Sequence, residues 1–333
     1  MIEKHIVKKN KNIFLLLKIV VMLFFALPKI LLATEEPENI ILLADKNSKV
    51  HKNITDAFKK NIEIKSIDIM SIQEFISSRD RLEKDTRLII SIGTNITAQL
   101  IELKISAPIF SIAIPKLSYQ KLEKKYKESQ SAGKKYPFSA IYIDQPLSRN
   151  LNLIQEILPS TKRINIALGP DTFHYSDSIN NETKKRGWTT NIAKIDKEIT
   201  LIKELNQTLI KSDVMLGIID PLVFSRTSAR NILLTTYRWR VPLIGISPAY
   251  VDAGALAAIH SSPNQLGAQL AEAIESLSLS HSTLLPPPQY PKKFKVSINY
   301  RVAEAMGIQI IEENELIKKL ERLEKKQGFK EAQ

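Results

Sequence analysis

The feature that most constrains the fold is a regular alternation of short apolar runs with amphipathic segments. Each run has the length of a strand, is almost continuously apolar, and is followed by a segment with helical spacing. Strands of this kind, separated by single helices, are typical of parallel sheets covered on both faces. The runs are too many for one small sheet, so the sequence predicts two α/β lobes. The expected strands are Asn39–Ala44, Ile62–Met70, Thr86–Gly93, Pro108–Ile114, Phe138–Ile143, Arg163–Leu168, Thr190–Ile195 and Val214–Ile219.

One later stretch breaks this alternation. Val241–Ile246 and Ala255–His260 read as two strands, and the turn-rich loop Ser247–Gly254 between them leaves no room for a helix. Such a stretch suits a chain that crosses from one lobe to the other, although an ordinary strand–turn–strand within one sheet is the alternative. A second crossing is expected near Phe138–Ile143. The sequence therefore predicts that the chain passes between the lobes at these two places.

The two crossings set the expected domain boundaries. The first lobe is expected to contain 34–139 and 256–290, and the second lobe 140–255 and 291–312. Residues 313–333 are rich in charged residues and are expected to form a charged C-terminal helix or tail, solvated rather than a partner site.

The N-terminus predicts export. Residues 1–33 combine a basic start, an apolar core from Ile13 to Leu27 and a Leu-Leu-Ala sequence ending at Ala33. This is the three-part form of a secretory signal peptide, with cleavage expected after Ala33 and a periplasmic location for the exported chain. An uncleaved anchor is the alternative, because the apolar segment extends to Leu32. Cys is absent, which excludes disulfides, thiol catalysis, thiolate metal sites and a lipid-modified N-terminal Cys.

Charge and motifs exclude several functional classes. The net charge is +13, but the first 33 residues hold six Lys and one Glu, which leaves about +8 spread along the chain. There is no nucleic-acid motif and no Arg-rich block, so we expect no nucleic-acid partner. The nucleophile elbow, the zinc-protease motif, the Walker loop and the dinucleotide fingerprint are also missing. We therefore expect no enzyme and no cofactor.

Polar residues at the carboxyl end of the third strand form the first candidate site. In open α/β sheets, ligands bind in the crevice outside these strand ends. Ser91, Gly93 and Thr94 end this strand and open a helix, where free amides and the Thr94 hydroxyl can hold a carboxylate. The alternative is that Thr94 only caps its helix.

The second lobe contributes further candidates. Asp171 and Asp220 each follow a strand, where a carboxylate can pair with a ligand amino group, although Asp220 can equally be a turn residue before Pro221. The loop Ser247–Gly254 adds Ser247, Tyr250 and Asp252. An aromatic residue there can wall a pocket for an apolar or ring-bearing ligand. Packing in the core is the alternative for Tyr250.

Several of these segments together resemble a known family. The chain is similar to periplasmic solute-binding proteins of the uncharacterised ABC-transporter type, which include tryptophan/tyrosine-type binding proteins with a type I periplasmic-binding fold. The order and spacing of the matching segments carry the resemblance, which covers essentially the whole exported chain. These segments are Ser91–Thr94, Leu151–Arg163, Asp220 with Val223, Val241–Gly245, Val251–Leu256, Leu266 with Gly267, and Val296–Gly307.

The resemblance implies a monomeric, hinged receptor with two Rossmann-like lobes. Such a receptor captures a small ligand, here an amino acid or similar small carboxylate, and delivers it to an ABC permease and its ATPase in the inner membrane. A ligand-sensing subunit that docks on a membrane signalling protein is the alternative. The sequence departs from the family after the fourth strand, where Ile112–Ser118 lacks the usual Asp and Lys116 stands nearby.

Overall fold

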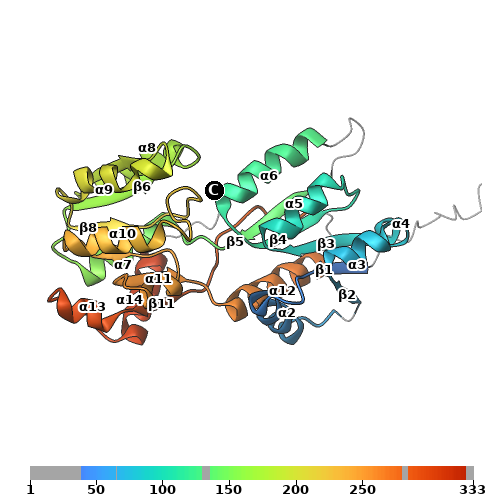
Figure 1. Cartoon of the computed structure of the whole chain (residues 1–333). Helices are drawn as coiled ribbons and strands as arrows, with labels where there is room; N and C mark the ends of the chain where they lie inside the picture. Colours follow the sequence, from blue (N-terminus) through green and yellow to red (C-terminus); the bar gives the residue numbers. More distant parts are fainter. Residues whose placement is uncertain (1–38, 65, 130–135, 280–283, 328–333) are drawn as a thin grey trace, which may run out of the picture. The chain divides into compact units, whose positions relative to one another are not determined.

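Two α/β sheets form the core of the computed structural model, which describes residues 39–64, 66–129, 136–279 and 284–327 (Figure 1). The first sheet is parallel throughout and has the order β2-β1-β3-β4-β5. Its strands match the predicted apolar runs closely, apart from β2, which begins five residues later than expected. They are β1 (Asn39–Leu43), β2 (Ile67–Met70), β3 (Thr86–Ile92), β4 (Ile109–Ile114) and β5 (Phe138–Tyr142).

Helices cover both faces of the first sheet, as near-continuously apolar strands require. One face packs against α2 and α12, and the other against α3, α5 and α6 (Figure 1). A Cβ at Gly267 in α12 would lie 2.4 Å from the Ile54 carbonyl oxygen of α2, so only glycine lets these two helices approach so closely. The helices are α2 (Lys49–Asn61), α3 (Ile72–Ser77), α4 (Arg79–Leu82), η1 (Glu83–Asp85), α5 (Thr94–Glu102), α6 (Lys116–Ser129) and α12 (Pro263–Leu279).

The second sheet has six strands in the order β11-β10-β9-β8-β6-β7. All neighbours are parallel except β11, which pairs antiparallel with β10. The strands are β6 (Arg163–Leu168), β7 (Thr189–Lys194), β8 (Val214–Leu216), β9 (Leu243–Ile244), β10 (Ala257–His260) and β11 (Lys295–Ile298).

Helices cover this sheet on both faces as well. Buried side chains of α7, α8, α13 and α14 form the core on one face, and those of α9, α10 and α11 form the core on the other. The elements are α7 (Leu147–Ile157), η2 (Phe173–Tyr175), α8 (Ser176–Lys184), η3 (Glu198–Thr200), α9 (Leu201–Leu209), α10 (Ala229–Arg238), α11 (Pro248–Asp252), α13 (Tyr300–Ala305) and α14 (Glu313–Lys326). Among the described residues, no helix is both long enough and apolar enough to cross a membrane.

The stretch between β9 and β10 differs from its prediction. The expected loop contains the short helix α11, which begins at Pro248, a position where proline is favoured. Ile244 of β9 pairs in parallel with Ala257 of β10, so both strands belong to the second sheet. The chain therefore passes to α12, beside the first sheet, only after His260, later than the boundary expected at 255/256.

The crossing expected near Phe138–Ile143 also lies later in the chain than predicted. All of β5 pairs with β4, so the expected boundary at 139/140 falls inside a strand of the first sheet. The connections between the two sheets are 143–146, 261–262 and the chain segment that ends at 294. The places where the chain crosses between the sheets depend on which strands pair along their whole length. The apolar pattern of the sequence does not contain this pairing.

The C-terminal helix is packed, which corrects the expectation of a solvated end. Leu316 and Leu320 of α14 are completely buried in the core of the second sheet, while most charged residues of the helix face outward. The spacing of four residues between the two leucines places them on one helical face. Residues 328–333 of the predicted tail and the signal segment 1–33 lie outside the described residues.

A buried arginine ties this helix to the connections between the sheets. Arg149 is 1% exposed and donates to both carboxylate oxygens of Glu324 in α14, at 2.5 and 3.1 Å. It also donates to Gln145 Oε1 and to the Pro291 carbonyl, and its guanidinium lies 4.4 Å from the centre of the Phe294 ring. One side chain thus binds two of the three connections and the last helix.

Removing the Glu324 carboxylate is expected to destabilise the protein strongly. Glu324→Ala removes the carboxylate that accepts two hydrogen bonds from the buried Arg149 guanidinium, and breaking comparable buried pairs costs about 3–5 kcal/mol. Urea denaturation measures the difference. The control, Glu321→Ala, removes an exposed carboxylate from the same helix and should stay within about 0.5 kcal/mol of the parent. Equal stabilities of the two variants would contradict the role given to Arg149.

Candidate ligand-binding site

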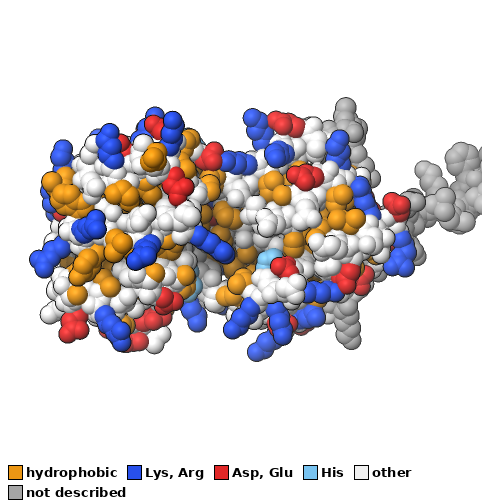
Figure 2. All heavy atoms as spheres, in the orientation of Figure 1, with side chains coloured by type: hydrophobic (Ala, Val, Ile, Leu, Met, Phe, Trp, Pro, Cys, Tyr) orange, Lys and Arg blue, Asp and Glu red, His pale blue; other side chains and the backbone are white. Residues whose placement is uncertain are grey.

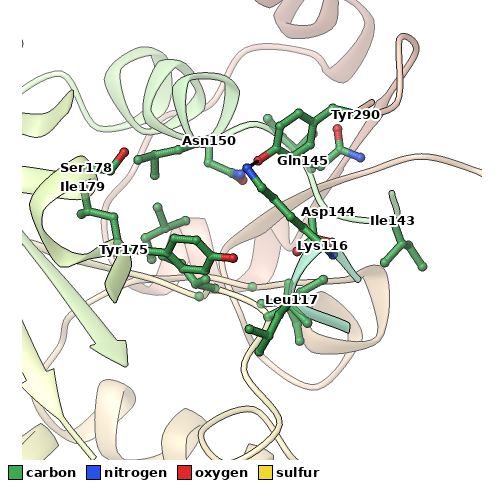
Figure 3. A pocket seen from close by; sticks show the side chains of 18 residues that line it. Lys116, Leu117, Ile143, Asp144, Gln145, Asn150, Tyr175, Ser178, Ile179 and Tyr290 are labelled. Carbon is green, nitrogen blue, oxygen red and sulfur yellow. Dashed lines mark hydrogen bonds between the residues drawn. The ribbon is translucent and has the colours of Figure 1, made fainter. Parts of the chain in front are cut away.

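A cavity of about 160 Å³ lies where strand ends of the two sheets face one another. Lys116, Asp144 and Gln145 come from the carboxyl ends of β4 and β5, and Tyr175 and Ser178 come from η2 and α8 (Figure 3). Most of the other lining groups are apolar. The full lining is Lys116, Leu117, Ile143, Asp144, Gln145, Leu147, Asn150, Tyr175, Ser178, Ile179, Leu216, Gly217, Ile218, Ile219, Gly245, Ile246, Ile259 and Tyr290.

Lys116 and Asp144 are the charged residues of this lining. The Lys116 backbone N–H, at the start of α6, donates to Asp144 Oδ2 at 2.6 Å. The Lys116 ammonium donates to the Tyr290 hydroxyl at 3.1 Å and lies 5.2 Å from the centre of the Tyr290 ring. Asp144 therefore holds the first turn of α6 in place, while the Lys116 side chain reaches across the opening toward Tyr290 (Figure 3).

Burial shifts the pKa values of this group. It raises the pKa of Asp144 to about 6, although the Lys116 amide and charge oppose the shift. Burial lowers the pKa of Lys116, and nearby Asp144 opposes that change. Burial and then Asp144 raise the pKa of Tyr290 to about 12. Titratable groups with such shifts, gathered in a cavity, mark a candidate functional site.

Two contacts join the elements on opposite sides of the cavity. The Tyr175 hydroxyl donates to Gln120 Oε1 of α6 at 2.6 Å. The next residue of α6, Lys121, pairs with Asp171, which follows β6. The predicted residue Asp171 thus contacts the helix of the first sheet, but it lies outside the cavity lining and is about half exposed.

The residues predicted at the end of β3 surround a helix start rather than this cavity. Ser91 is completely buried, and its hydroxyl is within hydrogen-bond distance of Thr97 Oγ1 at 2.8 Å, so it braces β3 against α5. Gly93 has φ of +82° and caps α5, which begins at Thr94. A Cβ at Gly93 would lie 3.4 Å from His51 Nε2. A ligand role for these three residues stays a prediction.

Asp220 is enclosed by its own loop. It is 1% exposed, and its oxygens accept hydrogen bonds from the Thr172 hydroxyl and from the backbone amides of Gly169, Leu222 and Val223, at 2.6 to 3.1 Å. These bonds tie the loop after β6 to the loop after β8. The expected contact with a ligand amino group stays a prediction, and the hydrogen bonds do not favour it because both oxygens are already used.

The three candidates around α11 have different surroundings. Tyr250 packs against Phe224, with ring centres 5.7 Å apart, and its buried hydroxyl has no hydrogen-bond partner among the described atoms. Ser247 precedes α11 and is partly buried, while Asp252 is exposed. All eight predicted residues are described, and none of them is part of the cavity lining. Their ligand contacts stay predictions.

The sequence contained a signal for part of the observed site. Lys116 and Asp144 follow β4 and β5 directly, so the strand-end rule applied to β3 points equally to them. Tyr290 carried no such signal, because it lies in a connector far along the chain. Positive charge gave no guide either, since Lys and Arg side chains are spread over the visible surface among acidic ones (Figure 2).

Asp220→Ala is expected to lower the free energy of unfolding by more than about 2 kcal/mol, because it leaves buried amides without an acceptor. Chemical denaturation measures the loss. Asp252→Ala, which removes an exposed carboxylate, serves as the control and should change stability by less than about 0.5 kcal/mol. Full stability of the Asp220 variant would show that its hydrogen bonds do not hold the two loops.

The raised pKa of Asp144 predicts a pH dependence of stability. Because the folded protein takes up this proton more readily than the unfolded chain, the contribution of Asp144 is fully present below pH 3.8 and is lost as pH rises through about 6. Asp144→Asn removes the titration. Across this window, the variant should gain stability relative to the parent in denaturation curves taken at several pH values, whereas Asp252→Asn should not. Parallel profiles for Asp144→Asn and the parent would contradict the assignment.

Solved structures support the fold. An ABC domain in complex with L-Trp from Streptococcus pneumonia is 17% identical, with a TM-score of 0.55 over 82% of this chain and 95% of that chain. A ligand-free, open substrate-binding protein with adhesive properties from Clostridium difficile is also 17% identical, with a TM-score of 0.59 and the same coverage. A conserved domain protein from Vibrio cholerae matches at 20% identity and a TM-score of 0.55, again over 82% and 95%.

A family model assigns the chain to a protein family, which these structural similarities alone do not do. No curated protein sequence matches the chain. The model described as "ABC transporter substrate binding protein" matches residues 41–320, which include β2 to β11 in full and β1 from Ile41 onward. The two-sheet fold is that of type I periplasmic-binding proteins, and the family is one of binding proteins rather than enzymes. The chain belongs to the ABC transporter substrate-binding protein family.

Proposed function

We propose that this protein is an extracytoplasmic receptor that captures a small organic ligand in the cavity and delivers it to an ABC importer. The observation that carries the proposal is the composition of the cavity. A lysine, a carboxyl group and two tyrosine hydroxyls converge within an otherwise largely apolar lining. A few polar groups in an apolar cavity are typical of sites that orient a small molecule.

The position of the cavity supports capture by closure. Its lining comes from strand ends of both sheets, so one ligand can contact both at once. Ligand contacts that exist only in the closed form are what shift a hinged protein toward closure. Tyr175 with Gln120, and Lys121 with Asp171, join the same elements beside the cavity and would add to the closed form.

The expected ligand is an amino acid or a similar small carboxylate. Lys116 and the Tyr290 hydroxyl provide donors for a carboxylate, while Ile218, Ile219 and Ile246 provide an apolar wall. The structural relative from Streptococcus pneumonia holds L-Trp, a carboxylate with an aromatic ring. Cavities of about 150 Å³ accept a benzene-sized group, so a small ring suits the volume here.

Delivery requires a membrane partner outside the chain. Membership of the substrate-binding family supports a permease and its ATPase as that partner. The signal-like segment 1–33, with cleavage after Ala33, supports export to the periplasm as a proposal from the sequence.

Ligand binding is expected to stabilise the exported chain against heat. A ligand at 100 times its dissociation constant adds about 2.7 kcal/mol to the free energy of unfolding. Thermal unfolding of residues 34–333 with a panel of amino acids, small carboxylates, nucleosides and sugars measures the shift. The Ser178→Trp variant, which fills the cavity from an exposed position of α8, should keep its stability without ligand and lose the shift.

The matched control is Asp177→Trp, which adds the same side chain at the neighbouring exposed position outside the cavity lining. It should retain the ligand-induced shift. Equal shifts in both variants would move the binding site away from this cavity. The absence of any shift across the whole panel would contradict the receptor function.

A further inference from the structure

We propose that this cavity selects an organic anion without a free amino group, such as a ring-bearing carboxylate, and that Lys116 is the residue that determines this specificity. The inference rests on the proposed receptor function and adds the charge of the ligand to it. It separates a simple carboxylate from a zwitterionic amino acid, both of which the proposed function allows.

The first support is an ammonium group without an anionic partner. Among the described residues of the lining, Lys116 is the only one with a cationic side chain, and it is partly buried. Its Nζ donates to the neutral Tyr290 hydroxyl, and among the described residues no carboxylate forms an ion pair with it. Burial disfavours this charge, and the Asp144 carboxyl group offsets that effect only from beyond ion-pair distance, so an incoming anion gains from joining the ammonium group.

The second support is a pair of donors at one place. Because the Tyr290 oxygen accepts from Lys116, the hydrogen of this hydroxyl remains available, and none of the described atoms accepts it. The Lys116 ammonium and the Tyr290 hydroxyl therefore present two donors next to each other at the opening (Figure 3). A carboxylate has two oxygens and accepts from both donors, which a ligand ammonium group cannot do.

The third support is that the carboxyl group in the cavity lining already has a hydrogen-bond partner in the protein. Of the lining residues that the structure describes, Asp144 alone has a carboxyl group, and its Oδ2 accepts a hydrogen bond from the backbone N–H of Lys116. The start of α6 attracts negative charge and keeps this carboxyl group at the helix terminus. The Asp144 carboxyl group already interacts with the Lys116 amide and with the Lys116 charge. A ligand amino group placed there would have to share the carboxyl group with both. This arrangement disfavours a zwitterion.

Three probes with one phenyl ring test the inference by calorimetry with the exported chain: 3-phenylpropionate, 3-phenylpropanamide and L-phenylalanine. They share a ring and chain length and differ only in the carboxylate and the amino group. We expect 3-phenylpropionate to bind at least about tenfold more tightly than each of the other two, the difference typical of a hydrogen bond to a charged group.

Variants assign the selectivity to Lys116. Lys116→Met keeps the backbone N–H that Asp144 accepts and the length of the side chain, and should bring the affinities for 3-phenylpropionate and 3-phenylpropanamide together. Lys125→Met, at an exposed position of the same helix, should keep the full difference. Thermal unfolding without ligand verifies that both variants are folded.

Several outcomes would overturn the inference. They are equal or tighter binding of L-phenylalanine or of the amide, an unchanged preference in Lys116→Met, and no binding of the three probes when an amino acid or sugar of the panel does bind. In each case the receptor function stands. An unchanged preference in Lys116→Met would reject Lys116 as the residue that determines specificity, and the other outcomes would reject the assigned ligand charge. If no compound of the whole panel binds, the receptor function fails and this inference fails with it.

Discussion

The arrangement of the two sheets depends on one buried guanidinium group. Arg149 contacts Glu324 of the last helix, the connection that follows β5 and the connector before β11. A charge so completely removed from water is tolerated when its donors find acceptors, and here a carboxylate, a side-chain amide and a carbonyl accept four hydrogen bonds from the guanidinium. Gln145 extends the network, because its amide donates to Ser261, whose hydroxyl donates to the Lys293 carbonyl. All three connections are thereby joined next to the cavity.

The same connections position the cavity. Parallel strands direct their carboxyl ends to one edge of each sheet, so the residues after β4, β5 and β8 gather where the chain crosses. Gln145 lines the cavity and also accepts from Arg149, so the cavity wall and the Arg149 network share a side chain. Any movement of the sheets about these connections therefore changes the surroundings of the cavity and of the Arg149 network.

The cavity combines opposite charges under different constraints. Asp144 is bound to the amide at the start of α6, whereas the Lys116 ammonium extends to a neutral hydroxyl. Burial acts on both groups in the direction that disfavours charge, raising the pKa of Asp144 and lowering that of Lys116. A negatively charged ligand would offset the cost of burying the Lys116 ammonium group. This is the physical basis for proposing a carboxylate as the ligand.

The sequence by itself determined the two-sheet α/β architecture, the family and most strand positions, because apolar strands buried on both faces leave a local pattern in the chain. It also placed Ser91 and Thr94 correctly at the end of β3, whereas β8 ends at Leu216, well before Asp220. Proximity to a strand does not decide whether a side chain faces a cavity or, as with Asp220, its own loop. Only the tertiary structure decided that α14 is packed, that β10 belongs with β9, and that Tyr290 lies beside Lys116. Such contacts join residues far apart in the chain, and their energies depend on packing and desolvation that no local pattern encodes.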